Sequence, residues 1–328
     1  MTTYLPILLG KLQGIFGYVV LGLVITEWLL LVISKKMESN REGWVNVFSY
    51  VLDSIPYFFL GKVMIFGTMT WLYQYRLTTL SDAWYIWILA YLVYDFMFWL
   101  VHLLGHQVRF FWCIHGVHHT AEEMKLTVAV RGSFLGFLHI PLTIIWLPIL
   151  GFDPFMIFIC ESIARLYGLY EHVNDHFDRY VGKQRLLEYL FITPSVHRVH
   201  HAKNYIYLDR NYGETFSIWD KIFGTFQTEL DDIKPVYGIL SEEINSKSLW
   251  QVQLLLWRDL WRDIRSAPRL IDKIRYVLKP PGWNHRDGGK MAAAYRDEAW
   301  QNYLHPLFKK EEVSPSNSKL EGISSSTI

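Results

Sequence analysis

The chain has 328 residues, enough for one large domain or two small ones, and 51% of them are hydrophobic. Its 14 Trp, 20 Tyr and 20 Phe, together with apolar runs near the length of a bilayer span, favour a membrane protein over a soluble one. A formal net charge of +1 argues against a nucleic-acid partner, because no basic excess is available to neutralise phosphates, and two cysteines outside any CxxC motif argue against a disulfide framework.

Five apolar stretches are expected to form helices that cross or re-enter a bilayer, and they cover residues 15–34, 55–73, 83–101, 134–150 and 154–170. Each approaches the roughly 20 residues that a helix needs to cross about 30 Å of hydrocarbon. The last two are joined at 151–154 by a segment that only fits a tight turn. The N-terminus lacks a basic start and a cleavage site, so it is expected to be an anchor. We predict an all-α membrane bundle of about four or five such helices.

Basic residues set the expected orientation. They follow the first apolar stretch and the third, at Lys35, Lys36, Arg41, Arg109, Lys125 and Arg131. By the positive-inside rule the His-rich segments and the C-terminal region then lie in the cytosol, in a bacterial inner membrane or the endoplasmic reticulum.

The character changes after residue 230. Residues 249–278 mix Trp and Arg with leucines, which is typical of an amphipathic helix that lies on the membrane surface or packs on the catalytic core. A Ser-rich tail from about residue 309 is expected to be disordered. The predicted division is 1–82 (N-terminal membrane helices), 83–230 (catalytic domain), 231–308 (C-terminal helical region) and 309–328 (tail).

Histidines carry the chemistry. Eleven of the thirteen lie between residues 102 and 201, and ten of these stand in helical spacings. The ten are His102 and His106, then His115, His118 and His119, then His172 and His176, and finally His197, His200 and His201. Residues three and four apart share one side of a helix, so each group presents two or three imidazoles together. Imidazole is a ligand for Fe, Zn, Cu and Ni, which predicts a cytosolic two-metal site. His139, His285 and His305 are interpreted as ordinary core or surface residues.

Several acidic residues stand near these histidines. Asp95 is two helical turns before His102 and either orients a ligand histidine or pairs with another group. Glu161 and Arg165 are spaced for an ion pair inside the fifth apolar stretch. Beside His172, hydrogen-bond acceptors or solvated turn residues are expected at Glu171, Asn174 and Asp175.

Segments 102–106, 115–119 and 193–201 resemble the three histidine boxes of the fatty acid hydroxylase / sterol desaturase superfamily. The DRNYG at 209–213 and the WDKIFGT at 219–225 are also similar to that family. Within it the chain is most similar to the alkylglycerol monooxygenase branch, through the PGW at 281–283 and the VYG at 236–238. The catalytic resemblance covers roughly residues 84–230.

The resemblance implies a di-iron enzyme that uses O₂ and external electrons to hydroxylate or desaturate a lipid chain. It implies metal ligation by eight box histidines, with His172 and His176 completing the set. It also implies a separate electron donor, tetrahydrobiopterin or a cytochrome b5 or ferredoxin type of protein, since the chain has no HPGG cytochrome b5 motif. All-nitrogen sites also bind zinc avidly, so the metal is not fixed by the ligands.

Three other functions compete with a lipid hydroxylase. A lipid or sterol desaturase would use the same site. A haem cytochrome would use the thirteen-residue spacing of His102 to His115, but it leaves most histidines unexplained. A metal transporter should hold its ligands near mid-membrane, whereas these stand at the ends of the apolar stretches. The lipid itself remains open among alkylglycerols, sterols, acyl chains and aminolipids.

Overall fold

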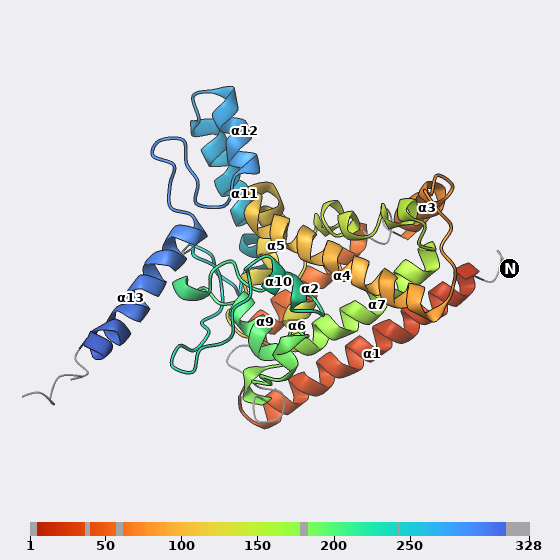
Figure 1. Cartoon of the computed structure of the whole chain (residues 1–328), viewed down its shortest axis with the longest axis horizontal. Helices are drawn as coiled ribbons and strands as arrows, with labels where there is room; N and C mark the ends of the chain where they lie inside the picture. Colours follow the sequence, from red (N-terminus) through yellow and green to blue (C-terminus); the bar gives the residue numbers. More distant parts are fainter. Residues whose placement is uncertain (1–4, 37–39, 57–61, 178–182, 242, 313–328) are drawn as a thin grey trace, which may run out of the picture.

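The computed structural model describes residues 5–36, 40–56, 62–177, 183–241 and 243–312. Over these ranges the chain forms α-helices and short 3₁₀-helices, with two isolated β-bridges, so the predicted all-α class is confirmed. Figure 1 shows α7 (Pro154–Glu171) running alongside α1 (Leu5–Ile33), with α4 (Trp84–Gln107) crossing their direction.

The long helices form the body of the molecule. They are α1 (Leu5–Ile33), α2 (Asn40–Pro56), α3 (Lys62–Tyr73), α4 (Trp84–Gln107) and α7 (Pro154–Glu171). Helix α4 packs against α7, and their buried core includes Met97, Val101, Met156 and Ile157. Among the described helices, α4 alone is long and apolar enough to cross a membrane, while Gly17–Ile33 and Gly136–Leu150 are shorter apolar stretches.

Segment 134–150 departs from the single helix expected there. It forms three consecutive 3₁₀-helices, η2 (Gly136–Leu138), η3 (Ile140–Thr143) and η4 (Leu147–Leu150). Pro141 and Pro148 stand near the start of η3 and η4. Because proline has no N–H to donate to the preceding turn, each proline interrupts a continuous α-helix and begins a new short one.

The tight turn before α7 is present as predicted. Gly151 has φ +102°, and a Cβ there would lie 2.5 Å from the carbonyl oxygen of Thr78. Only glycine fits such a position without strain. The Asp153 carboxylate then accepts hydrogen bonds from the N–H groups of Phe155 and Met156, and Pro154 occupies the first helical turn, so α7 starts at a fixed point.

Short helices follow α4 and carry six of the ten predicted ligand histidines. They are α5 (Arg109–His119), α6 (Leu126–Ala129), η5 (Asp175–Phe177), η6 (Leu187–Tyr189), α9 (Pro194–His200), η7 (Tyr205–Tyr207) and α10 (Ile218–Ile222). Helix α5 packs on α4, and α9 packs on α7, so the histidine segments meet at the end of the long helices.

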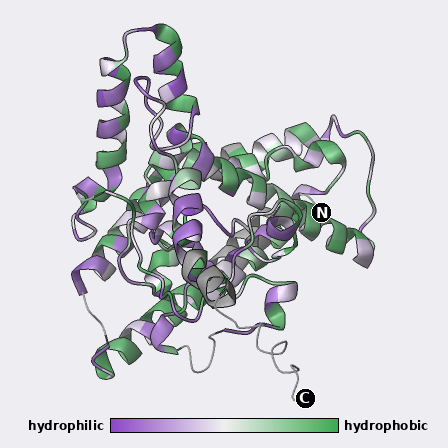
Figure 2. Ribbon diagram, turned by 60° about the vertical axis from the view of Figure 1, so that its left-hand side comes forward, coloured by the Kyte–Doolittle hydropathy of each residue, from purple (hydrophilic) through white to green (hydrophobic). Residues whose placement is uncertain are grey.

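The predicted helix at 249–278 is divided into α11 (Leu249–Ser266) and α12 (Leu270–Leu278), with Pro268 between them. Helix α11 packs against α2 and α5 and buries Val252, while Trp250 and Trp261 remain more than half exposed. In Figure 1, α11 and α12 run across the direction of α1 and α4. Figure 2 shows hydrophobic and hydrophilic residues mixed along this pair.

Helix α13 (Ala292–Glu312) is the last described element and contacts η7. The tail was expected to be disordered from about residue 309. The backbone is still helical through Glu312, and residues 313–328 lie outside the described part of the chain.

Candidate metal centre

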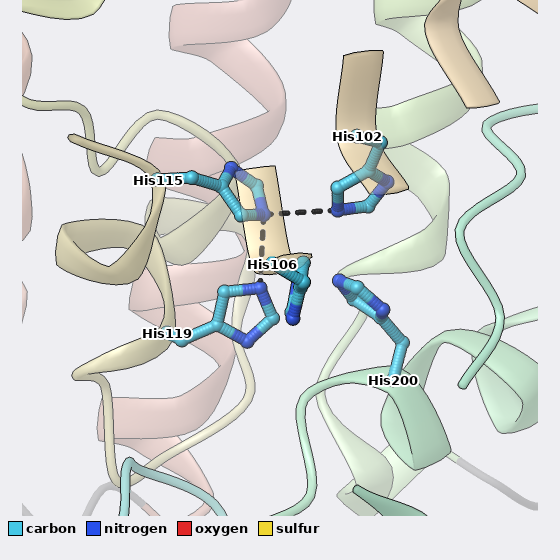
Figure 3. Close-up of side chains that lie close together, drawn as sticks. All are labelled: His102, His106, His115, His119 and His200. Carbon is cyan, nitrogen blue, oxygen red and sulfur yellow. Dashed lines mark hydrogen bonds between the residues drawn. The ribbon is translucent and has the colours of Figure 1, made fainter. Parts of the chain in front are cut away.

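Five histidines converge into a first group, in which the nearest ligand atoms lie within 4.8 Å of one another. Figure 3 shows their rings pointing toward a common space. The group consists of His102 and His106 from α4, His115 and His119 from α5, and His200 from α9. Three helices that are separate in sequence therefore build one site.

Four further histidines form a second group, whose ligand atoms also lie within 4.8 Å of one another. They are His118 from α5, His172 at the C-terminal end of α7, His197 from α9, and His201 directly after α9. Ring centroids from the two groups approach to 4.4 Å between His119 and His201, so the groups are neighbours.

Each HxxHH motif divides its histidines between the two groups. In α5, His115 and His119 join the first group and His118 joins the second. Around α9 the division is reversed, because His200 joins the first group while His197 and His201 join the second. On a helix, position i+4 is rotated by about 40° from position i and position i+3 by about 60° in the opposite sense, so the side chains at i+3 and i+4 diverge by about 100°. The motif thus contributes imidazoles to both groups from a single segment.

Backbone carbonyls fix the protonation of several rings. The Nδ1 atoms of His102, His200 and His172 lie 2.8, 2.9 and 2.6 Å from the carbonyl oxygens of Tyr212, Arg210 and Gly168. A carbonyl oxygen only accepts, so each Nδ1 carries the proton and donates it. The Nε2 atom of each ring then has a free lone pair, and the rings direct these atoms into the groups.

The Nε2 atoms approach one another closely. They are 2.9 Å apart between His102 and His115, and 3.0 Å apart between His172 and His197. In addition, the Nε2 atoms of His106 and His200 are buried without a hydrogen-bond partner among the described residues. Buried polar atoms are normally paired, and a metal bound at about 2.0–2.1 Å would satisfy nitrogens arranged in this way. The residues therefore fit a metal ion in each group.

Burial keeps several of these rings neutral. It is the main cause that lowers the pKa of His118 and His119 well below the usual range, and the neighbouring imidazoles add to the effect. Burial also lowers the pKa of His172 to about 4. Metal ligation requires the neutral imidazole, so the site is prepared for metal at neutral pH.

Two carboxylates support the groups from behind. The Nδ1 atom of His106 lies 3.2 Å from an Asp209 carboxylate oxygen, and Nδ1 of His197 lies 3.4 Å from Glu171. Such partners fix the orientation of a ligand ring and raise its basicity. Glu171 was one of the acceptors considered from sequence. Asp209 was not, although it begins the DRNYG segment that carried the family resemblance.

Asp95 contacts neither group directly. Its carboxylate accepts hydrogen bonds from the backbone N–H groups of Thr215 and Phe216 and from the Trp219 indole. Of the two roles considered, pairing with another group therefore describes this arrangement. Asp220 acts on the same loop by accepting from the N–H groups of Tyr212 and Gly213. Because the Tyr212 carbonyl holds His102, these carboxylates position a histidine through the backbone.

His176 lies outside both groups, so its assignment as a metal ligand stays a prediction. Helix α7 ends at Glu171, and His176 lies in the separate turn η5 with its side chain exposed. The four-residue spacing from His172 therefore loses its helical meaning. The Nε2–H group of His139 donates to the Val101 carbonyl at 3.0 Å, because a carbonyl oxygen only accepts, and His139 is therefore a satisfied core residue.

Other predicted residues lie near the site. Glu161 and Arg165 form the predicted ion pair at 2.7 Å. Asn174 is buried and donates to the Met124 carbonyl, while Asp175 is exposed. His285 lies 2.8 Å from the Tyr276 hydroxyl, and the side chain of His305 lies outside the described ones.

A cavity of about 450 Å³ adjoins both groups. His102 and His115 line it from the first group, and His118, His172 and His197 line it from the second. The remaining wall is largely apolar and includes Val20, Leu21, Val24, Phe98, Val101 and Ile114. A long apolar ligand can therefore reach imidazoles of both groups.

The family comparison follows the segment that builds this site. The model of the fatty acid hydroxylase family matches residues 87–225, which contain all nine grouped histidines. This segment is similar to the fatty acid hydroxylase family. The predicted superfamily is thereby confirmed.

Individual relatives agree with the predicted branch. The chain is 29% identical to human alkylglycerol monooxygenase over 266 residues, which cover 79% of this chain and 56% of the relative. It is 33% identical to alkylglycerol monooxygenase of Xenopus tropicalis over 64% of this chain and 45% of the relative. An ornithine lipid hydroxylase of Rhizobium tropici is 30% identical over 42% of this chain and 41% of that protein.

The chain thus spans about half the length of the alkylglycerol monooxygenases that it matches. No solved structure matches it.

Proposed function

We propose that this chain is a membrane-bound di-iron oxidoreductase that uses O₂ to hydroxylate an alkyl or acyl chain of a lipid. The observation that carries the proposal is the pair of neighbouring all-histidine groups opening onto a largely apolar cavity. The fatty acid hydroxylase family match and the alkylglycerol monooxygenase relatives support the same chemistry.

Nine histidines would hold two iron ions, five around one and four around the other. Iron would supply the redox chemistry that breaks an unactivated C–H bond, which no side chain can do. Zinc would bind the same nitrogens without redox activity, so its presence in a purified sample would not identify the working metal.

The chain's own residues hold and orient the ligand imidazoles and shield the cavity from water. Asp209 and Glu171 stand behind His106 and His197, and the carbonyls of Tyr212, Arg210 and Gly168 keep three further rings in one tautomer. The apolar wall excludes water and holds a lipid chain against the lining imidazoles, where orientation selects one carbon.

A membrane location is part of the proposal, with several spans and the site at the cytosolic surface. Helix α4 is long and apolar enough to span, and His102 and His106 stand at its C-terminal end. Exposed apolar residues on α1, including Leu29, Val32 and Ile33, suit contact with lipid. On this view the metal groups sit where a spanning helix leaves the bilayer, and α11–α12 lies along its surface.

Electrons would come from an external donor, either tetrahydrobiopterin or a cytochrome b5 or ferredoxin type of protein. The proposed division keeps residues 83–230 as the catalytic domain, between N-terminal membrane helices and the C-terminal helical region. Lipid is the expected partner.

The decisive test uses the full chain in lipid nanodiscs, loaded with ferrous iron and supplied with ¹⁸O₂ and reduced pterin or a reduced ferredoxin system. A lipid product that gains one labelled oxygen is expected, and His118→Ala should abolish it. A product that loses two hydrogens without gaining oxygen would make the protein a desaturase. A metal-free protein, or one that oxidises no lipid with any donor, would refute the proposal.

A further inference from the structure

A polar wall interrupts the apolar lining of the cavity. Five side chains from four separate segments form this polar wall: Asp53 from α2, Tyr94 from α4, Glu161 and Arg165 from α7, and Glu214 from the loop before α10. A channel for a hydrocarbon chain alone would not need buried charged groups, because burying them costs free energy unless they find partners. The wall therefore calls for a ligand with polar atoms.

Glu214 is the most deeply buried charged member of the polar wall, with only 6% of its surface exposed. One of its carboxylate oxygens accepts a hydrogen bond of 3.0 Å from the Tyr94 hydroxyl. The backbone is fixed on both sides, since Asp220 accepts from the N–H of Gly213 and Asp95 accepts from the N–H of Thr215. Glu214 is therefore held rigidly against the cavity, as a recognition group should be.

Asp53 adds a second acceptor. Its Oδ1 atom is buried and has no hydrogen-bond partner among the described residues. The carboxylate packs against Gly132 and Gly136, where an added Cβ would lie 2.8 and 2.3 Å from it. These two glycines make the room that the Asp53 side chain occupies beside the cavity.

Carboxyl groups outnumber guanidinium groups in the cavity lining. Four carboxyl groups line the cavity, those of Asp53, Glu161, Glu171 and Glu214, against the two guanidinium groups of Arg131 and Arg165. Arg165 is paired with Glu161, and Arg131 donates to Asn46 and to the Ser246 carbonyl and lies 3.9 Å from Glu42. No lysine lies among the lining residues that the structure describes.

We propose that the polar wall selects lipids whose headgroup offers hydrogen-bond donors and carries no negative charge, and that it excludes phosphate headgroups. Glu214, oriented by Tyr94, is the specificity-determining residue. The inference rests on the proposed function, because it assumes that a lipid occupies this cavity. Hydroxyl and amine headgroups share the required chemistry, and the test separates them.

The experiment measures binding to the full chain in nanodiscs, loaded with metal, by displacement of a fluorescent lipid. Three competitors carry the same saturated chain on a glycerol ether, a primary amine or a phosphate monoester. The wild-type protein should bind the glycerol ether, the amine or both at least about tenfold more tightly than the phosphate. Equal binding of all three would overturn the inference.

Two variants locate the effect. Glu214→Leu should weaken binding of the favoured headgroup about tenfold and leave the phosphate within about twofold, because only the donor headgroup loses its acceptor. Glu214→Gln keeps the shape of the side chain and should reduce amine binding more than glycerol ether binding, which provides a test should the leucine variant fail to fold. Glu243→Gln, on the exposed surface, is the matched control. Equal weakening for all three lipids in both variants would also overturn the inference.

This assay does not depend on turnover. A wild-type protein that shows the headgroup preference and oxidises none of the lipids would refute the proposed function and leave the polar wall intact. Equal binding of all three lipids together with their oxidation would overturn the inference about the polar wall and support the proposed function. The metal ions contribute equally to the variants and the wild type, so the difference between them reports on the wall.

Discussion

The two histidine groups differ in size and in their contact with the cavity. The first has five imidazoles, of which His102 and His115 line the cavity. The second has four, of which His118, His172 and His197 line it. The first group is therefore more enclosed by protein, and the second presents a larger share of its ligands to the space where a substrate would lie.

This difference suggests a division of work between neighbouring ions. Catalytic metal sites keep a position open for a small molecule, whereas sites with a full ligand set mainly hold the metal. By this criterion the four-histidine group suits the ion that meets the substrate, and the five-histidine group suits a supporting ion. Substitutions in the two groups should consequently differ in effect.

The largest expected effect comes from two separate variants, each of which removes one ligand from one of the groups. His118→Ala leaves three imidazoles in the second group, and His119→Ala leaves four in the first. The His118 variant should release one of two metal equivalents and lose more than about 100-fold of lipid oxidation, since even residues behind ligands account for 10–100-fold. The His119 variant should keep both metals and lose less. Metal analysis and product formation measure both, and equal losses would contradict the division.

The carboxylates behind the groups should give the next largest effect. Glu171→Gln and Asp209→Asn each remove the charge that orients a ligand ring, and each should weaken metal binding about 10–100-fold. The loss should be greater for Glu171, because its side chain is 2% exposed while that of Asp209 is 19% exposed and water can replace it. Titration against a chelator of known affinity measures the change. Unaltered metal affinity in both variants would remove their supporting role.

A buried glutamate in α1 should affect stability more than chemistry. Glu27 accepts hydrogen bonds from the N–H groups of Leu126, at the start of α6, and Asn174, in the loop after α7, at 2.6 and 3.0 Å. Glu27→Ala leaves both donors buried and unpaired, which should cost about 1–3 kcal/mol for each. Thermal unfolding should show a lower midpoint than for Thr26→Ala, whose exposed hydroxyl only bonds the Gly22 carbonyl. Equal midpoints would show that α1 is not anchored through Glu27.

Nine of the ten predicted ligands lie in the two groups, and sequence spacing could bring them together because helical periodicity is a local property. His102 with His106, and His115 with His119, were placed together by the geometry of a single helix. Which imidazole faces which group depends on how α4, α5, α7 and α9 pack, and periodicity carries no information about packing. The division of each HxxHH motif between two groups was therefore not foreseen.

Asp209 shows a different limit of prediction. It lies more than one hundred residues from His106 and adopts a left-handed backbone conformation, with φ +53°. Neither the long-range contact nor the turn has a periodic signature, so the only signal was the resemblance of its segment to the family. The single helix expected over 134–150 is absent for a local reason. The apolar composition of the segment favours one continuous helix, but two prolines interrupt it.

Replacement of His176 should have the smallest effect of these substitutions. It has the same four-residue spacing from His172 as the paired ligands have from each other, but α7 ends between them and leaves His176 exposed in η5. His176→Ala should retain both metals and change stability by less than about 0.5 kcal/mol, as surface substitutions usually do. His172→Ala is the matched comparison and should release metal from the second group. Loss of metal from the His176 variant would mean that η5 closes onto the site when the ions bind, and the second group would then have five histidines.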